Sequence, residues 1–211
     1  MKQFKIAVIG GTGKSGTYLV QELLNRMIPI KLLLRTTSLF ETTNPLVEIV
    51  RGDARDIRAI SSLLEDCTAV ISTLGQPVGE ESIFSDAARN VLQTMIEKGI
   101  SRYIVIAGLN VDAIGDHKNE KVRFATDWMY QNYPKTTKDR QLEYELLSGS
   151  EIDWTLVRLP MIIQTEKRFP MEVSLTDCPG ENISATDLAH FLANQLLSDE
   201  YIRKSPFIAN S

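Results

Sequence analysis

The stretch Phe4–Leu24, FKIAVIGGTGKSGTYLVQELL, decides the fold. It begins with a short apolar run, which predicts a strand that is covered on both faces and consists of Phe4, Ile6, Ala7, Val8 and Ile9. A glycine-rich turn follows this run. After the turn, apolar residues recur at helical spacing, which predicts an amphipathic helix with one buried face formed by Leu19, Val20, Leu23, Leu24 and Met27. We therefore expect a strand, a tight turn and a helix.

The turn from Gly10 to Gly16 has the features of a phosphate-binding turn. Gly10 permits a sharp turn, Gly13 lacks the Cβ that would keep a pyrophosphate from the backbone, and Gly16 lets the helix pack close to the strand. The helix N-terminus adds free N–H groups and a partial positive charge. A P-loop would need glycine where Val8 stands, so a nucleotide triphosphatase is disfavoured. A strand–helix junction without a ligand is the other alternative, and three glycines make it costly in chain entropy.

The end of the second predicted strand indicates the cofactor. This strand, Ile30–Leu34, is followed by Arg35, about 20 residues past the glycine turn, where such folds meet the adenosine ribose. An acidic residue here would hold the 2′-hydroxyl of NAD, whereas an arginine followed by Thr36, Thr37 and Ser38 suits the 2′-phosphate of NADP. Such a contact contributes about 1.5–3 kcal/mol, or roughly one to two decades of preference. We expect NADP, with NADPH preferred over NADH; a solvated arginine is the alternative.

Strand and helix patterns alternate along the rest of the chain. Further strands are predicted at Leu46–Val50, Ala69–Thr73, Tyr103–Ala107, Asp153–Arg158 and Phe207–Ala209. Four helices are predicted: after Asp56, from Glu80 to Lys98, from Thr137 to Leu147, and after the capping box Ser184–Asp187. The apolar spacing places Ile57 on the buried side of the first of these helices and Ile96 on the buried side of the second. We expect residues 112–136 to be irregular, with Trp128–Tyr130 closing a pocket, and residues 164–182 to form a substrate-side flap. The predicted fold is α/β, a single domain over residues 1–211 with a doubly wound, mostly parallel sheet.

Composition excludes several classes of protein. The 211 residues carry a net charge of −4, which argues against nucleic acid as a partner. No stretch approaches the ~20 apolar residues of a membrane span, and a core strand begins almost at once, so we expect no signal peptide and a cytoplasmic location. Cys67 and Cys178 are isolated and are expected to be reduced, with no metal site. His117 and His190 show no partner in the sequence.

Several segments together resemble the atypical short-chain dehydrogenase/reductase group. The nearest likeness is to its small NAD(P)H-binding members, the flavin reductase/biliverdin reductase B proteins and the NmrA-like proteins. The resemblance rests on Gly10–Gly16, Leu34–Arg35, Gly52–Asp53, Ser72–Gly75, Ile152–Pro160 and Ile183–Ala189. It implies a Rossmann fold and dinucleotide binding, and it is less specific for the reaction.

The resemblance also implies where the cofactor binds. Asp53 and Ala54 would meet the adenine, Thr73–Gly75 the middle of the cofactor, and Leu159–Met161 the nicotinamide. The full set of implied cofactor residues is Gly10, Thr12, Gly13, Lys14, Ser15, Gly16, Arg35, Thr36, Asp53, Ala54, Thr73, Leu74, Gly75 and Pro160.

The chain departs from the family pattern at the proton donor. Members with Tyr-x-x-x-Lys use the lysine to lower the tyrosine pKa, but here the tyrosines and lysines, Tyr130 with Lys135 and Tyr133 with Lys138, are five apart. The serine usual after the fifth strand is replaced by Ala107 and Gly108. Reducing a ketone needs a positioned acid, whereas a flavin or quinone can take protons from water.

Two functions of different classes follow. The first is an NADPH-dependent reductase of a flavin, quinone or similar small planar acceptor, for which the substrate-side candidates are Asn110, Tyr144 and Arg168. The second is a non-catalytic NADP(H)-binding sensor with a protein partner, as the NmrA-like resemblance implies. A sugar-nucleotide epimerase or dehydratase is a third, weaker hypothesis. Those enzymes need a larger C-terminal substrate domain, and the roughly 50 residues after Arg158 leave little room for one.

Overall fold

Eight strands form the main sheet of the computed structural model, which describes residues 4–76 and 79–211. Their order is β3-β2-β1-β4-β5-β6-β10-β8, and every pair is parallel except β8 with β10. Two short strands, β7 and β9, pair in parallel beside it. The strands are β1 Ile6–Ile9, β2 Ile30–Leu34, β3 Val47–Arg51, β4 Ala69–Ser72, β5 Arg102–Gly108, β6 Asp153–Leu159, β7 Met161–Ile163, β8 Met171–Ser174, β9 Asn182–Ser184 and β10 Phe207–Asn210.

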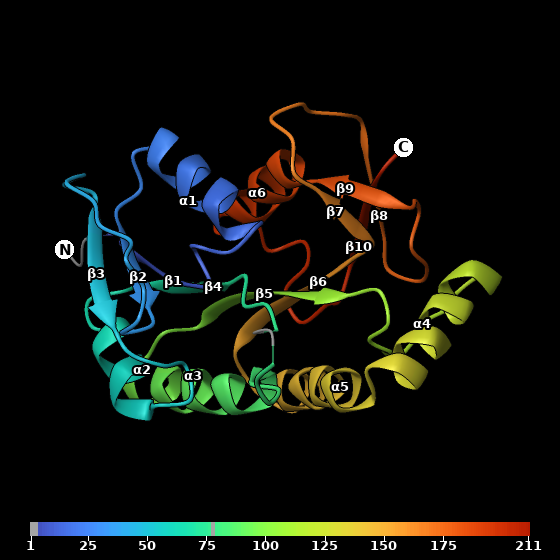
Figure 1. Ribbon diagram of the computed structural model, residues 1–211, viewed down its shortest axis with the longest axis horizontal. Coiled ribbons are helices and arrows are strands. Elements are labelled where there is room, and N and C mark those ends of the chain that lie inside the picture. The colour runs from blue at the N-terminus through green and yellow to red at the C-terminus, as the bar shows by residue number, and fades with distance from the viewer. Residues whose placement is uncertain (1–3, 77–78) are drawn as a thin grey trace.

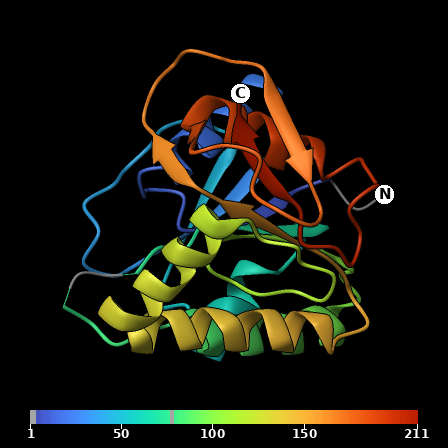
Figure 2. The ribbon, with the colours of Figure 1, turned by 90° about the vertical axis from the view of Figure 1, so that its right-hand side faces the viewer.

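Helices cover both faces of this sheet (Figure 1). Helices α1 and α6 pack together on one face, and α2, α3 and α5 lie on the other. Helix α4 lies at one end of the sheet and contacts α5 (Figure 2). The helices are α1 Gly16–Asn25, α2 Ile57–Leu63, α3 Phe84–Lys98, α4 Glu120–Asn132, α5 Pro134–Ser148 and α6 Ala185–Asn194. The predicted doubly wound, mostly parallel α/β fold is confirmed.

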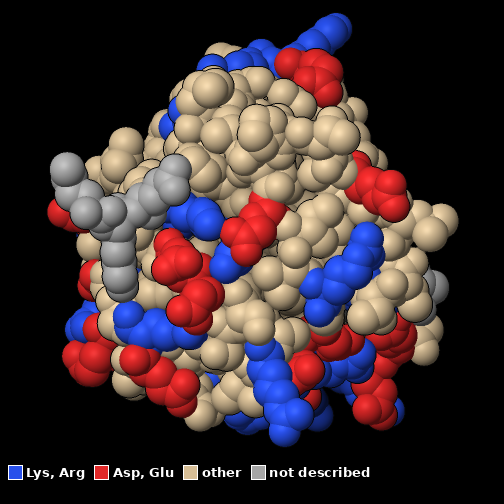
Figure 3. Space-filling model, turned by 90° about the vertical axis from the view of Figure 1, so that its left-hand side faces the viewer, with Lys and Arg blue, Asp and Glu red and all other residues tan. Residues whose placement is uncertain are grey.

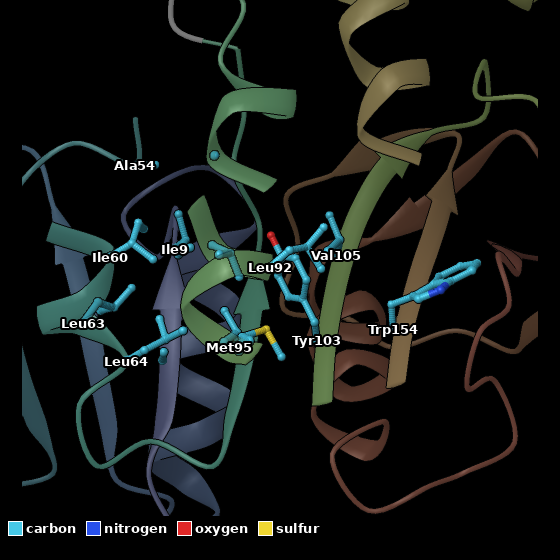
Figure 4. Close-up of a cluster of buried hydrophobic side chains, with 14 of the residues drawn as sticks. Ile9, Ala54, Ile60, Leu63, Leu64, Leu92, Met95, Tyr103, Val105 and Trp154 are labelled. Atoms are coloured by element: carbon cyan, nitrogen blue, oxygen red, sulfur yellow. The ribbon is translucent and has the colours of Figure 1, made fainter. Parts of the chain in front are cut away.

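The apolar runs of the strands form two cores. In β1, Ile6 and Val8 join the cluster under α1 and α6, while Ala7 and Ile9 join the cluster on the opposite face. This division follows from the alternation of side chains along a strand. Phe4, predicted to belong to the same covered strand, lies before β1 and is 42% exposed. Figure 4 shows the second cluster, where Ile9 lies with residues of α2, α3, β5 and β6. A strand buried on both faces therefore reads as an unbroken apolar run.

The helix ends follow the predicted capping chemistry. Asp56 accepts a hydrogen bond from the backbone N–H of Arg58 at the start of α2. Ser184 does the same for Asp187 at the start of α6. Gly99, with φ of 65°, ends α3 in the left-handed conformation.

The prediction of irregular structure over residues 112–136 was wrong. Helix α4 occupies Glu120–Asn132, and the side chain of Asn119 caps it by accepting from Val122 N–H. The helix is hard to recognise in the sequence because Val122 and Thr126 are its only buried residues, so it has no apolar stripe. Its packing against α5, rather than amphipathicity, positions it.

Three apolar residues predicted on buried helix faces are exposed. Met27 lies past the end of α1 with φ of 57° and is 71% exposed. Ile57 opens α2 and is also exposed, and Ile96 in the last turn of α3 is 68% exposed. Helix α3 itself begins at Phe84 rather than Glu80. Each error falls at a helix end, where the periodic pattern continues beyond the packed surface.

The segment over residues 164–182 contains part of the main sheet. Strand β8 pairs antiparallel to β10, with Phe207 opposite Ser174 and Asn210 opposite Met171. Asp187 of α6 secures the segment, because its side chain accepts from the backbone N–H of Phe169 at 2.9 Å. The role of this segment as a substrate flap stays a prediction.

The two cysteines are buried and His190 lies in a contact between two helices. Cys67 and Cys178 are free, buried thiols. His190, for which the sequence indicates no partner, has two in the fold: its Nδ1 lies 3.1 Å from Glu22 Oε1 and 2.9 Å from Arg26 Nη2, between α1 and α6. In the described ranges no three His, Cys, Asp or Glu side chains are grouped to hold a metal. Nor does any helix in residues 4–76 and 79–211 have the length and apolarity needed to cross a membrane.

Candidate functional site

A cavity of about 790 Å³ lies at the carboxyl ends of the parallel strands. The sheet order reverses here, because β2 pairs with one side of β1 and β4 with the other. Thr73 continues the pairing past β4, with its N–H donating to Ile9 O at 2.9 Å. Ligands of open α/β sheets bind in this crevice. The predicted residues that line it are Gly10, Thr12, Gly13, Lys14, Ser15, Arg35, Asp53, Ala54, Thr73, Leu74, Gly75 and Pro160.

Two glycines are required by the shape of the turn. Gly10 has φ of +79°, and a Cβ there would lie 2.7 Å from the carbonyl atoms of Thr73. A Cβ on Gly16 would lie 2.1 Å from Gly10 O. Gly16 does not line the cavity, so its role is to let α1 approach the turn. A Cβ on Gly13 would have only Gly10 O as a neighbour, at 3.2 Å, and Gly13 does line the cavity.

The start of α1 offers donors to an anion. Ser15 is the N-cap residue, yet its hydroxyl makes no capping hydrogen bond, and it lines the cavity. Lys14 adds a cationic side chain to the same lining. The dipole of the helix, which is positive at its N-terminus, also favours an anion there. This combination is suited to the pyrophosphate of a dinucleotide.

Arg35, directly after β2, lines the same cavity as the glycine turn. Its side chain is 59% exposed and lines the cavity together with Thr37 and Ser38. Thr36, predicted to join it, does not line the cavity; Thr37 and Ser38 do. The arginine Nη1 is 2.7 Å from Glu80 Oε1.

Asp53 follows β3 and lines the cavity. It accepts from the backbone N–H of Arg55 at 2.8 Å and from the Arg55 guanidinium at 2.9 and 2.8 Å. These hydrogen bonds, chiefly those of the guanidinium, hold the pKa of Asp53 below its ordinary value against the opposing effect of burial. Asp53 is therefore an ionised acceptor at neutral pH.

Arg140 of α5 is a lining residue that the sequence interpretation missed. Its Nη1 donates to Ile106 O at 3.0 Å and to Glu143 Oε2 at 2.6 Å, and its Nη2 donates to Leu74 O at 2.5 Å. The guanidinium carbon lies 3.2 Å from the centre of the Phe84 ring. The arginine is thus fixed at the ends of β4 and β5, with three of its five N–H donors used.

Glu143 lies behind Arg140 and is fully buried. Burial raises the pKa of Glu143, while the charge and hydrogen bond of Arg140 act in the opposite direction. A sequence signal for Arg140 exists, because it lies at helical spacing between the buried residues Thr137 and Leu147. That spacing indicates that Arg140 faces the protein, but it does not show that its tip reaches the cavity.

The comparison with known families agrees with this geometry. A family model described as NAD(P)H-binding matches residues 10–199. The chain belongs to this NAD(P)H-binding family. The matched range takes in the glycine turn and every residue that lines the cavity except Ile9 of β1.

Solved structures show the same fold in proteins of this kind. The chain is similar to a short-chain dehydrogenase/reductase from Veillonella parvula DSM 2008 with a TM-score of 0.81 and 16% identity, over 99% of this chain and 94% of the other. A structure from the same organism in complex with NADP matches with a TM-score of 0.81 and 14% identity, over 98% and 94% of the two chains. ChuY, an anaerobillin reductase from Escherichia coli O157:H7, matches with a TM-score of 0.81 and 16% identity, over 98% and 97%.

The cradle of the NAD(P)H-binding chain fits a dinucleotide. The space that a Cβ on Gly13 would enter, the uncommitted hydroxyl of Ser15 and the Lys14 cation would hold a pyrophosphate. Arg35 would meet the adenosine ribose, and Leu159–Pro160 lie at the far end of the lining, after β6. Met161, grouped with these residues in the sequence interpretation, is exposed and does not line the cavity.

The substrate-side candidates do not line the cavity, and each has another contact. Asn110 is buried beside Gly108, Tyr144 Oη accepts from Ile114 N–H at 3.4 Å, and Arg168 pairs with Asp187 at 3.2 Å. A role for any of them toward substrate stays a prediction.

The tyrosines of the imperfect Tyr–Lys pairs also lie elsewhere. Tyr133 joins α4 to α5, and its ring packs edge-on against Trp128 at 5.7 Å between centroids. Neither Tyr130 nor Tyr133 lines the cavity. The expected closure of a pocket by Trp128–Tyr130 is not seen at this cavity, because α4 packs at the end of α5 instead.

Proposed function

We propose that the protein is an NADPH-dependent reductase that transfers hydride to a flavin, quinone or similar planar acceptor. The observation that carries this proposal is the composition of the cavity. One end has the glycine turn and Arg35, and the other has apolar groups from β5 and β6 together with Arg140. The ChuY structure, an anaerobillin reductase of the same fold, supports a reductase as well.

The chain's own residues would hold the cofactor in a defined direction. Arg35, with Thr37 and Ser38, would bind the 2′-phosphate, and Ser15 with the start of α1 would bind the pyrophosphate. When bound, NADPH supplies a hydride, which is two electrons with one proton. Ile106–Gly108 and Leu159–Pro160 would flank the reacting end and exclude water from it.

Arg140 would stabilise the charge that hydride transfer creates. A planar acceptor gains negative charge when it receives hydride, and a fixed guanidinium beside it lowers the energy of that state. The three hydrogen bonds to Ile106 O, Leu74 O and Glu143 hold the group in place before substrate arrives. Its two other N–H donors have no hydrogen-bond partner among the described residues, so we propose that they bind the acceptor.

The lining favours a planar acceptor over a ketone. Its titratable side chains are Lys14, Arg35, Asp53 and Arg140, and among the described lining residues there is no Tyr, His, Cys or Glu. A ketone oxygen needs a positioned proton donor, a role for which enzymes use Tyr, His, Cys, Lys or a carboxylic acid rather than a guanidinium. A reduced flavin or quinone can take its proton from water.

We also propose that the partner is a small molecule and that the location is cytoplasmic. The face drawn in Figure 3 intersperses Lys and Arg with Asp and Glu. With a net charge of −4, this distribution disfavours nucleic acid as a partner.

Steady-state reduction tests the proposal. Purified protein is mixed with NADPH and then with FMN, a soluble quinone or a tetrapyrrole, while absorbance of the reduced nicotinamide is followed. We expect turnover with at least one acceptor. Arg140→Met combined with Glu143→Gln, which avoids an unpaired buried carboxylate, should lower kcat at least about tenfold, whereas Arg123→Met on the exposed side of α4 should not.

The same assay distinguishes the alternative function. Tight NADPH binding without turnover of any acceptor would contradict the reductase proposal. It would instead support a non-catalytic NADP(H)-binding regulator with a protein partner.

A further inference from the structure

The side chain of Glu80 lies against the arginine assigned to the 2′-phosphate. Glu80 Oε1 is 2.7 Å from Arg35 Nη1, and Glu80 Oε2 is 3.6 Å from Arg55 Nη2. The carboxylate therefore lies between two guanidinium groups, one after β2 and one after β3. An anion with oxygens facing two guanidinium groups is also the arrangement in which proteins bind phosphate.

Arg35 has no other ion-pair partner among the described residues, whereas Arg55 is also bound to Asp53 by the 2.8 and 2.9 Å contacts given above. Glu80 is thus the group that neutralises Arg35. A 2′-phosphate that binds Arg35 must either displace this carboxylate or lie beside it, and two like charges at one guanidinium repel each other.

We propose that Glu80 is a specificity-determining residue that competes with the 2′-phosphate of NADP(H) for Arg35 and Arg55. A dinucleotide without that phosphate leaves the Arg35–Glu80 pair intact and loses nothing to it. Glu80 therefore weakens the binding of NADP(H) but not that of NAD(H), and so reduces the protein's preference for NADP(H) over NAD(H). This inference rests on the proposed NADPH-dependent function and names a second residue that regulates its cofactor choice.

The exposure of the pair sets the size of the effect. Arg35 and Glu80 have 59% and 37% exposed side chains, so water and salt screen their attraction. An exposed ion pair of this type corresponds to about a two- to fivefold change in an equilibrium constant. The competition is therefore weak enough for a phosphate to overcome and large enough to measure.

Binding measurements on Glu80→Gln test the competition. Dissociation constants of wild type and variant are measured by titration calorimetry for NADPH, NADH, adenosine 2′,5′-bisphosphate and 5′-AMP. We expect Glu80→Gln to bind NADPH and the bisphosphate about two- to fivefold more tightly, with NADH and 5′-AMP unchanged. Glu81→Gln is the matched control, because it removes the same charge one residue away and the side chain of Glu81 makes no ion pair in the described part of the chain.

The outcomes separate this inference from the proposed function. If wild type binds NADPH but Glu80→Gln leaves the NADPH-to-NADH ratio unchanged, or weakens NADH, the competition is refuted and the reductase proposal stands. If Glu81→Gln tightens the binding of NADPH as much as Glu80→Gln does, the gain comes from the loss of one negative charge near the site and not from the Arg35–Glu80 pair, and the inference is again refuted. If wild type binds neither dinucleotide, both proposals fall.

Discussion

Two glycines of one turn are expected to fail in different ways when each is replaced by alanine. A Cβ on Gly16 would lie 2.1 Å from Gly10 O and 2.7 Å from Gly11 Cα, which are backbone atoms that cannot move without opening the turn. Such overpacking costs about 1–3 kcal/mol, offset in part by the ~1 kcal/mol that alanine gains over glycine in a helix. The difference leaves a net loss of up to about 2 kcal/mol of unfolding free energy for Gly16→Ala, which lowers Tm by up to roughly 4–8 °C for a domain of this size.

Gly13→Ala should leave the fold almost unchanged. Its Cβ would meet only Gly10 O, at 3.2 Å, and its backbone is not in the left-handed region, so the change in stability should stay within about 0.5 kcal/mol. The new methyl group would instead enter the space that a pyrophosphate needs. We expect NADPH affinity to fall at least about tenfold.

Thermal unfolding with and without NADPH measures both effects. At a concentration of about 100 times the wild-type Kd, NADPH raises the free energy of unfolding of wild type by ~2.7 kcal/mol. After a tenfold loss of affinity, the same concentration raises it by only ~1.4 kcal/mol. Gly149→Ala is the matched control, because its Cβ would also face a carbonyl oxygen, Glu145 O at 3.3 Å, and Gly149 does not line the cavity. A Gly16→Ala protein with the Tm of wild type, or a Gly13→Ala protein with the full NADPH shift, would refute this account of the turn.

Three further predictions concern stability and reactivity. Asp187 is buried and accepts hydrogen bonds from Ser184, Phe169, Asn210 and Arg168, so Asp187→Ala should lose about 2–4 kcal/mol in urea unfolding and Asp187→Asn less. An Asp187→Asn protein as stable as wild type would show that the charge is unimportant, and one as unstable as Asp187→Ala would show that the charge accounts for the whole effect. Burial raises the pKa of Asp139, but hydrogen bonds from Ser82, Ser85 and the N–H of Phe84 outweigh this effect and hold the pKa below its ordinary value of 3.8. The ionised carboxylate therefore stabilises the fold above about pH 4, and this stabilisation is lost as the pH falls through the lower pKa of the folded state. Asp139→Asn should therefore make the free energy of unfolding depend less on pH in the acidic range. Burial raises the pKa of Cys67 to about 11, so its thiol should resist alkylation at pH 8 until the protein unfolds, and rapid labelling of the native protein would contradict this.

Local patterns in the sequence predicted most of the fold. Runs such as Ile30–Leu34 read as buried strands because side chains alternate between two covered faces, and Gly99 marks a helix end because it adopts the left-handed conformation. Helix α4 could not be predicted in this way, because it buries only Val122 and Thr126 and depends on packing against α5. A helix without an apolar stripe has no periodic signal to detect.

The sequence by itself determined the glycine turn, Arg35 and the alternation of strands and helices, because each depends on residues close together in the chain. Tertiary structure alone decided what surrounds them. Arg140 reaches the cavity from α5 by bonding to Leu74 O, 66 residues away, and Glu80 approaches Arg35 across 45 residues. Such contacts depend on how the parallel sheet brings the carboxyl ends of its strands to one edge, and no local pattern records that placement.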